Sequence, residues 1–211
     1  MSTDEHYEIL CRQDDERWHE FRTQGISASN VASVLGLTGK TDKKTGKWVY
    51  YPGSDPASAI ARMISGEVED LSDNPKVVAG LYLERPIMNW AEDVHKEKYD
   101  SWQHLLRSKK YPWLMATPDG FQEADGGRWL VEVKTHSEIT HAWRQGVPEY
   151  VVCQVQVQLA VTGLKRAKII EWCYGKHPQV HIVQRSEQAI ERIAAETKKI
   201  WDHIVAERAK L

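Results

Sequence analysis

Three charged side chains in two short motifs could act together on a phosphate group. The run Thr117-Pro118-Asp119-Gly120 places one carboxylate in a turn, and the run Leu130-Val131-Glu132-Val133-Lys134 is a short apolar strand. Strand side chains alternate between faces, so Glu132 and Lys134 project from the same side. If this strand pairs with the end of the Asp119 segment, two carboxylates and one ammonium group converge.

Such a cluster is suited to the hydrolysis of phosphodiesters. Neighbouring carboxylates repel one another and are costly to desolvate unless a cation neutralises them. Oxygen-rich sites of this kind suit Mg²⁺ or Mn²⁺, and a divalent cation beside a lysine can activate water against a phosphate. The Glu-Val-Lys run alone is better explained by an ordinary amphipathic strand after a Pro-Asp-Gly turn. The two motifs together, at this spacing, favour a site.

The overall composition indicates a soluble globular protein, and the length fits one domain over residues 1–211; the order of its elements, given below, predicts an α/β fold. The chain is 41% hydrophobic and 27% charged, and it holds no apolar run as long as a membrane span. Its three cysteines are scattered and odd in number, which argues against a disulfide framework and favours a reducing cytoplasm. A net charge of -2 argues against a protein that coats nucleic acid by bulk electrostatics.

Periodicity predicts the elements that must position the site. Helices are expected over residues 14–24, 31–35, 56–66, 75–98, 148–162 and 187–210. Strands are expected over 113–117 with a return through Phe121 as a hairpin arm, and over 128–135, 167–174 and 180–185. This order predicts a central mixed sheet with helices on both faces.

A polar segment over residues 38–58 is rich in Gly, Pro, Lys and Tyr, and two interpretations stay open for it. It is either an ordinary exposed loop or a mobile element that grips a polyanion. Its lysines would serve the second role, and Trp48, Tyr50 and Tyr51 could stack on bases or contact a partner chain.

Four sequence blocks resemble one family, the phage lambda-type exonucleases with the YqaJ-like viral recombination nucleases, within the restriction-endonuclease-like superfamily. The blocks are Trp18–Arg22 with Gly25–Ser29, Gly80–Glu84, the two motifs around Asp119 and Glu132, and Cys153–Gly163. Each block alone is degenerate, but the four in this order are specific. The resemblance implies a restriction-endonuclease-like core, a central mixed β-sheet flanked by α-helices.

The resemblance also implies a mechanism and its residues. The implied enzyme is a Mg²⁺-dependent exonuclease that degrades one strand of linear duplex DNA from its 5′ end and leaves 3′ single-stranded tails. The positions implied to bind one or two Mg²⁺ ions, with Mn²⁺ as a substitute, are Asp119, Glu132, the backbone carbonyl of Val133, and Glu84. Lys134 is implied to activate the attacking water, and Gln154 to hold the scissile region.

A pocket for the 5′-terminal phosphate is implied beside this site, at Arg22, Ser29 and Thr117. A guanidinium with two hydroxyls is a sensible receptor for a phosphate dianion. Thr117 stands where serine is more usual in the family, so the hydroxyl is kept and a methyl is added. Ser29 could instead, or at the same time, be the N-cap of the following helix.

The family resemblance further implies a homotrimeric ring around duplex DNA ends. Trp48, Trp102 and Trp143 are candidates for anchoring its interfaces. A single-strand annealing protein is the expected partner, in the cytoplasm of a bacterial or phage-infected cell, with no membrane involved.

Two other functions remain open. A related nuclease with a nicking, repair or restriction task would use the same Asp119, Glu132 and Lys134. A non-catalytic module that binds DNA ends could share the fold, although the intact acidic and lysine positions argue against it.

Overall fold

A computed structural model describes residues 5–67, 73–124, 126–136 and 141–211. Its strands are β1 (Tyr7–Arg12), β2 (Ile26–Ser27), β3 (Gly39–Thr41), β4 (Trp48–Tyr50), β5 (Asp100–Ser101), β6 (His104–Ser108), β7 (Leu114–Ala116), β8 (Gly120–Ala124), β9 (Gly127–His136), β10 (Arg166–Cys173) and β11 (Gln179–Gln184). Its helices are α1 (Trp18–Arg22), α2 (Ala28–Val34), α3 (Pro56–Ser65), α4 (Pro75–His95), α5 (His141–Arg144), α6 (Glu149–Thr162) and α7 (Glu187–Arg208).

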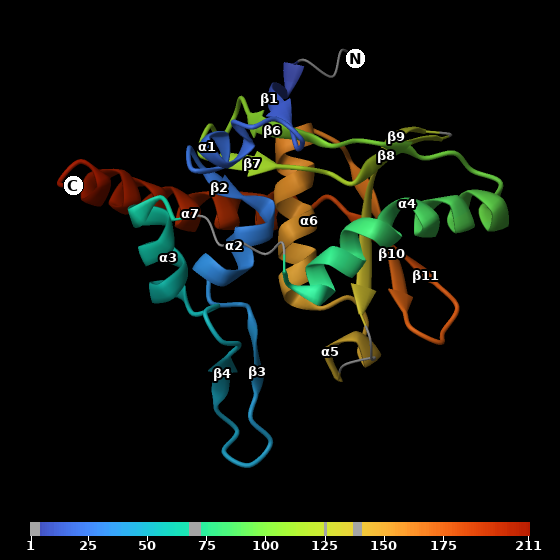
Figure 1. Cartoon of the computed structure of the whole chain (residues 1–211), viewed down its shortest axis with the longest axis horizontal. Helices are drawn as coiled ribbons and strands as arrows, with labels where there is room; N and C mark the ends of the chain where they lie inside the picture. The colour runs from blue at the N-terminus through green and yellow to red at the C-terminus, as the bar shows by residue number, and fades with distance from the viewer. Residues whose placement is uncertain (1–4, 68–72, 125, 137–140) are drawn as a thin grey trace.

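A mixed five-stranded sheet carries the two motifs. Its strand order is β11-β10-β9-β8-β5, and only β9 and β10 run parallel. Alternate residues of β9 pack on opposite sides: Leu130 faces Val155 of α6, whereas Val131 faces the apolar side of α4. The sheet therefore lies between α4 and α6 (Figure 1). The expected α/β core, a mixed sheet flanked by helices, is confirmed.

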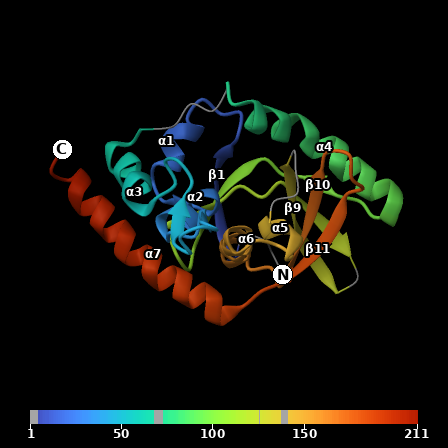
Figure 2. The same ribbon diagram turned by 90° about the horizontal axis from the view of Figure 1, so that it is seen from below.

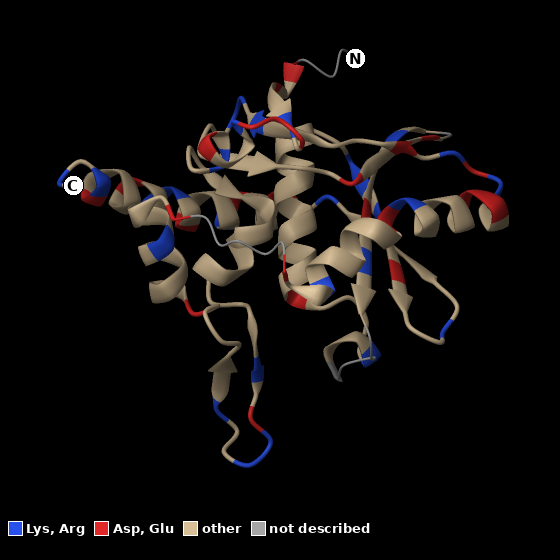
Figure 3. Cartoon of the chain, in the orientation of Figure 1, with Lys and Arg blue, Asp and Glu red and all other residues tan. Residues whose placement is uncertain are grey.

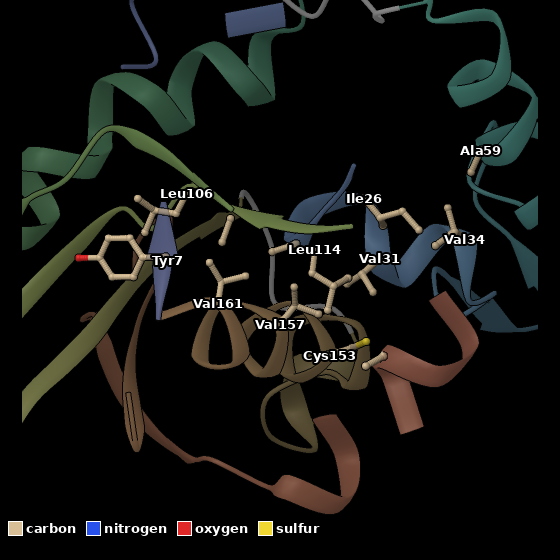
Figure 4. Close-up of a cluster of buried hydrophobic side chains, with 13 residues drawn as sticks. Tyr7, Ile26, Val31, Val34, Ala59, Leu106, Leu114, Cys153, Val157 and Val161 are labelled. Carbon is tan, nitrogen blue, oxygen red and sulfur yellow. The ribbon is translucent and has the colours of Figure 1, made fainter. Parts of the chain in front are cut away.

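A second sheet with the order β1-β6-β7-β2 supports the amino-terminal half. Its buried face packs with α2 and α6 in one hydrophobic cluster, in which Ile26, Leu106 and Leu114 meet Val157 and Val161 (Figure 4). The parallel pairing of β2 with β7 brings residues 26–27 beside residues 114–115. The segment after β2 and the segment after β7 therefore start from the same end of this sheet.

Helix α6 lies between the two sheets and is seen end-on near the centre of Figure 2. One row of its side chains, including Val157 and Val161, packs against the second sheet and α2. Another row, including Val155 and Leu159, packs against the five-stranded sheet. A left-handed Gly163 (φ 72°) ends the helix, as its position in the sequence predicts. Because both rows are buried, α6 is held rigidly and its remaining face can position polar groups.

The predicted hairpin arm over residues 113–121 is wrong. Strands β7 and β8 belong to different sheets, β7 pairing with β2 and β6, and β8 with β9 and β5. The Thr117–Asp119 segment therefore crosses from one sheet to the other. The residues near this segment in space are far from it in the sequence. The local sequence pattern therefore does not predict these contacts.

Two further segments differ from expectation. The helix predicted over residues 14–24 is only α1, and the next helix begins at Ala28 rather than Val31. The segment 38–58 is not simply a loop, because β3 and β4 form a hairpin that projects from the body (Figure 1). Across the described residues, no helix is long and apolar enough to cross a membrane.

Candidate active site

The predicted site residues line one cleft of about 1010 Å³. Its walls are α1 and the start of α2 on one side and α4 on the other, with the ends of β7, β8 and β9 and one face of α6 between them. The predicted residues on this cleft are Arg22, Ser29, Glu84, Thr117, Asp119, Glu132, Val133, Lys134 and Gln154. Segments separated by more than a hundred residues thus meet around a single opening.

Asp119 is tied directly to the site strand. Strands β8 and β9 pair with Gly120 opposite Val131, and the Val133 amide donates a hydrogen bond to Asp119 Oδ2 at 2.7 Å. The predicted pairing is therefore confirmed. This bond uses Oδ2 of Asp119 and leaves Oδ1 outside it.

Glu132 is the most completely held carboxylate of the cleft. Its side chain is buried, and Oε1 accepts hydrogen bonds from Lys134 Nζ and from Gln154 Nε2, both at 2.6 Å. Lys134 Nζ also donates to Gln154 Oε1 at 3.0 Å, which closes a triangle of three side chains. Gln158 Nε2 donates to the second oxygen, Oε2, at 2.6 Å.

Burial and electrostatic repulsion raise the pKa values of the other two carboxylates, Glu84 and Asp119. Burial and the nearby Glu132 raise the pKa of Glu84 to about 7, although Lys134 acts in the opposite direction. Burial, Glu132 and Glu84 raise the pKa of Asp119 well above its ordinary value. Burial by itself would lower the pKa of Lys134, but Glu132 and Asp119 outweigh it and the pKa is raised. Negative charge is therefore in excess here and calls for a cation.

The donor set suits a hard divalent cation. Three carboxylates and a strand carbonyl offer only oxygen atoms, which Mg²⁺ and Mn²⁺ prefer. Among the described residues, no three His, Cys, Asp or Glu side chains stand close enough to form a ready-made metal site. Oε1 of Glu132 already accepts two hydrogen bonds, whereas Oε2 accepts one and keeps a second lone pair for a cation.

The predicted phosphate pocket is grouped around Arg22. Its Nη2 donates to Ser29 Oγ at 3.2 Å, and its guanidinium stacks on Trp18 at 4.5 Å from the ring centroid. Burial lowers the pKa of Arg22 from its ordinary value. Thr117 lines the same cleft. A half-buried guanidinium with few acceptors around it is suited to binding an anion.

Ser27 and Gln158 were not predicted as site residues. Ser27 Oγ accepts from Arg22 at 3.4 Å and lies 3.0 Å from Ser29 Oγ. It is also the N-cap of α2, without a side-chain capping bond, so the alternative of Ser29 as the N-cap is wrong. Gln158 follows Gln154 by four residues, and this spacing on a helix could have indicated it.

The candidate interface tryptophans differ in exposure. Trp143 is buried inside the cluster between α6 and the five-stranded sheet, so it cannot anchor a contact with another chain in this structure. Trp102 is half-buried and packs edge-on against Phe121. Trp48 is exposed on β4. Only Trp48 and Trp102 remain candidates.

Solved structures with a similar fold include exonucleases. An alkaline exonuclease from Laribacter hongkongensis aligns with a TM-score of 0.71 and 21% identity, covering 93% of this chain and 95% of that one. The same enzyme in complex with dAMP gives a TM-score of 0.72 at 20% identity, with the same coverage. A phage-related exonuclease from Haemophilus somnus 129PT gives 0.63 at 14% identity, covering 90% and 98%. At these identities the likeness establishes the fold.

Comparison by sequence identifies the family. None of the curated proteins matches the chain. The model of the YqaJ-like viral recombinase domain matches residues 17–165, which are most of the chain and include every predicted site residue. The chain therefore belongs to the YqaJ-like viral recombinase family.

Proposed function

We propose that the protein is a Mg²⁺-dependent exonuclease that degrades one strand of linear duplex DNA in the 5′-to-3′ direction. The 3′ single-stranded tails that remain would serve recombination by strand annealing. One observation carries this proposal: a carboxylate–lysine cluster and an arginine–hydroxyl group line the same cleft. The first is suited to cutting a phosphodiester, and the second to holding a terminal phosphate nearby.

The carboxylates would supply the cation site. Asp119, Glu132, Glu84 and the Val133 carbonyl are the ligands, for one or two Mg²⁺ ions or Mn²⁺ in their place. A bound cation would polarise the phosphate and lower the pKa of bound water. Bringing that positive charge next to Glu84 and Asp119 would favour their ionised forms, because their pKa values are raised largely by burial and mutual repulsion.

Lys134 would position the attacking water and stabilise developing negative charge. Its pKa is raised, so the ammonium form is present at neutral pH. The hydrogen bonds to Glu132 and Gln154 fix where its Nζ lies, and such preorganised charge needs no rearrangement during the reaction. Gln154 would hold both partners in place beside the scissile phosphate.

Arg22, Ser29 and Thr117 would bind the 5′-terminal phosphate and so set the direction of digestion. Ser27 joins this group through its contacts with Arg22 and Ser29. A pocket for the chain end distinguishes an exonuclease from a nicking, repair or restriction nuclease with the same cluster. The likeness in fold to enzymes described as exonucleases supports the same choice.

The assembly that fits this activity is a homotrimeric ring. A net charge of -2 gives the chain little overall attraction for DNA, whereas enclosure of the duplex would keep it bound through many cycles. The hairpin of β3 and β4 carries exposed lysines at positions 40, 43, 44 and 47, and these would face the duplex (Figure 3). A single-strand annealing protein would take over the exposed 3′-ended strand.

The test is a comparison of DNA forms. With Mg²⁺, the purified protein should release mononucleotides from linear duplex DNA and leave covalently closed circles intact. Cleavage of closed circles would favour an endonuclease. Binding to linear ends without any release of nucleotides would favour the non-catalytic module.

A further inference from the structure

Gln158 is fully buried in α6 and holds the one oxygen of Glu132 that the other partners leave open. Lys134 and Gln154 both contact Oε1 of Glu132. Gln158 Nε2 donates to Oε2 at 2.6 Å, and the side chain has no exposed surface. The carboxylate of Glu132 is therefore held at both ends, which fixes the plane of the group and its rotation.

The amide of Gln158 is only half used. An ionised carboxylate accepts hydrogen bonds and cannot donate them, so the amide nitrogen must face Glu132. The amide oxygen is then left buried without a hydrogen-bond partner among the described residues. A buried acceptor without a partner destabilises the folded state, so packing alone would favour an apolar side chain at this position.

Gln156, two residues earlier on the same helix, is a buried glutamine with a structural role, and it provides a comparison for Gln158. It is buried, and both ends of its amide are used: Nε2 donates to the Gln184 carbonyl, and Oε1 accepts from the Ser186 amide. These bonds join α6 to the end of β11 and the start of α7, away from the cleft. Gln158, by contrast, lies directly behind the wall of the cleft and contacts a predicted cation ligand.

We propose that Gln158 is a positioning residue that orients the Glu132 carboxylate toward a divalent cation. This inference rests on the proposed function, in which Glu132 is a ligand. Groups that hydrogen-bond to a metal ligand orient it, and their loss commonly weakens metal affinity by about 10–100-fold. Gln158 touches neither DNA nor cation in this role and acts through Glu132 alone.

The test measures cation affinity directly in the full-length protein. Binding of Mn²⁺ is followed by the electron paramagnetic resonance signal of the free ion, for the wild type, for Gln158→Met and for the matched control Gln156→Met. Methionine is close to glutamine in length and shape but has no amide. We expect Gln158→Met to bind Mn²⁺ about 10-fold more weakly or worse, and Gln156→Met to keep the wild-type affinity while melting at a lower temperature.

The possible results distinguish failure of the positioning role of Gln158 from failure of the proposed metal-dependent function. If Gln158→Met binds Mn²⁺ as tightly as the wild type, the positioning role is wrong, even though the metal-dependent function stands. If the wild type itself binds no Mn²⁺, the proposed function fails and the role of Gln158 fails with it. Should Gln158→Met not fold by circular dichroism, Gln158→Asn, which keeps the amide but cannot reach as far, is measured with the same expectation.

Discussion

The amide of Val133 donates to Oδ2 of Asp119 at 2.7 Å, and this bond joins the two motifs that carry the site. Asp119 lies after β7 of the four-stranded sheet, whereas Val133 lies in β9 of the five-stranded sheet. The bond holds the Asp119 carboxylate against the backbone of β9. Its geometry needs an acceptor oxygen at position 119 but not a negative charge.

Asp119→Asn should therefore separate structure from chemistry. An asparagine oxygen can still accept the bond from Val133, so the melting temperature should stay close to that of the wild type. Loss of the charge would remove a proposed cation ligand, and digestion of linear duplex DNA should then fall on the order of 100-fold or more. Thermal unfolding and a nucleotide-release assay on the same preparation measure both. A variant that is folded and fully active would remove Asp119 from the site.

Lys134→Ala should nearly abolish digestion without unfolding the protein. Lys134 provides the fixed positive charge of the cluster, and loss of such a group costs roughly 10²–10³-fold in rate. Lys198→Ala is the control, because Lys198 forms an exposed pair with Asp202 on α7, outside the cleft. Rates are compared at saturating Mg²⁺. Equal losses in the two variants would point to a general charge effect rather than to this site.

Arg22→Ala should erase most of a preference for 5′-phosphorylated ends. A charge-assisted contact with a phosphate is worth about 1.5–3 kcal/mol, which corresponds to roughly 10–100-fold in rate. The matched control is Arg17→Ala, since Arg17 precedes the same helix but pairs with Asp15 on the surface. The assay uses one duplex with either a 5′-phosphate or a 5′-hydroxyl. Equal wild-type rates on both ends would rule out the phosphate pocket.

Cation binding should be coupled to pH through Glu84. Its pKa in the folded protein is about 7, above the ordinary 4.5, so the folded state keeps a proton that the unfolded state loses between these values. The metal-free protein should therefore lose stability as the pH rises from about 4.5 through 7. Added Mg²⁺ should stabilise it more at pH 8 than at pH 6, because the proposed cation site would need the ionised carboxylate.

Melting temperatures with and without Mg²⁺ across this range test the coupling. Glu84→Gln keeps the shape of the side chain and cannot titrate. The melting temperature of this variant should therefore change less with pH than that of the wild type. The contribution of Asp119, whose pKa is also raised, should remain in that variant. A wild-type profile that matches Glu84→Gln at every pH would contradict the assignment.

Light scattering should give a mass about three times the 24.3 kDa of one chain. A ring needs a head-to-tail interface that closes on itself, and Trp48 on the projecting hairpin is the more exposed of the two remaining anchors. Trp48→Ala should then shift the population toward smaller species. A single-chain mass that does not change on adding linear DNA would exclude the ring.

Much of the site could be predicted from the sequence because its motifs are local. The alternation in β9 places Glu132 and Lys134 on one face, and the Asp119 turn pairs with that strand as expected. Helix α6 was predicted from its apolar run and its terminal glycine. In each case the sequence pattern that predicts the element lies within a few residues of the side chains that the element positions.

The second sheet could not be predicted in the same way. Strand β1 mixes charged and apolar residues and was missed, and β6 is too short for periodicity to show. Strand β7 pairs with β2, which lies far earlier in the chain, rather than with the adjacent β8. The pairing of β2 with β7 depends on how α2 and α6 pack against the second sheet. The pattern of a single segment does not contain this information.

The most direct test of the account follows a label at each end of a linear duplex. One strand carries a 5′-terminal label within its phosphate, and a second substrate carries a 3′-terminal label on the same strand. With Mg²⁺, the account predicts that the 5′ label is released at once as a mononucleotide, that the 3′ label stays in the remaining single strand, and that excess chelator stops digestion. Early release of the 3′ label, labelled internal fragments, or undiminished digestion in chelator would contradict it.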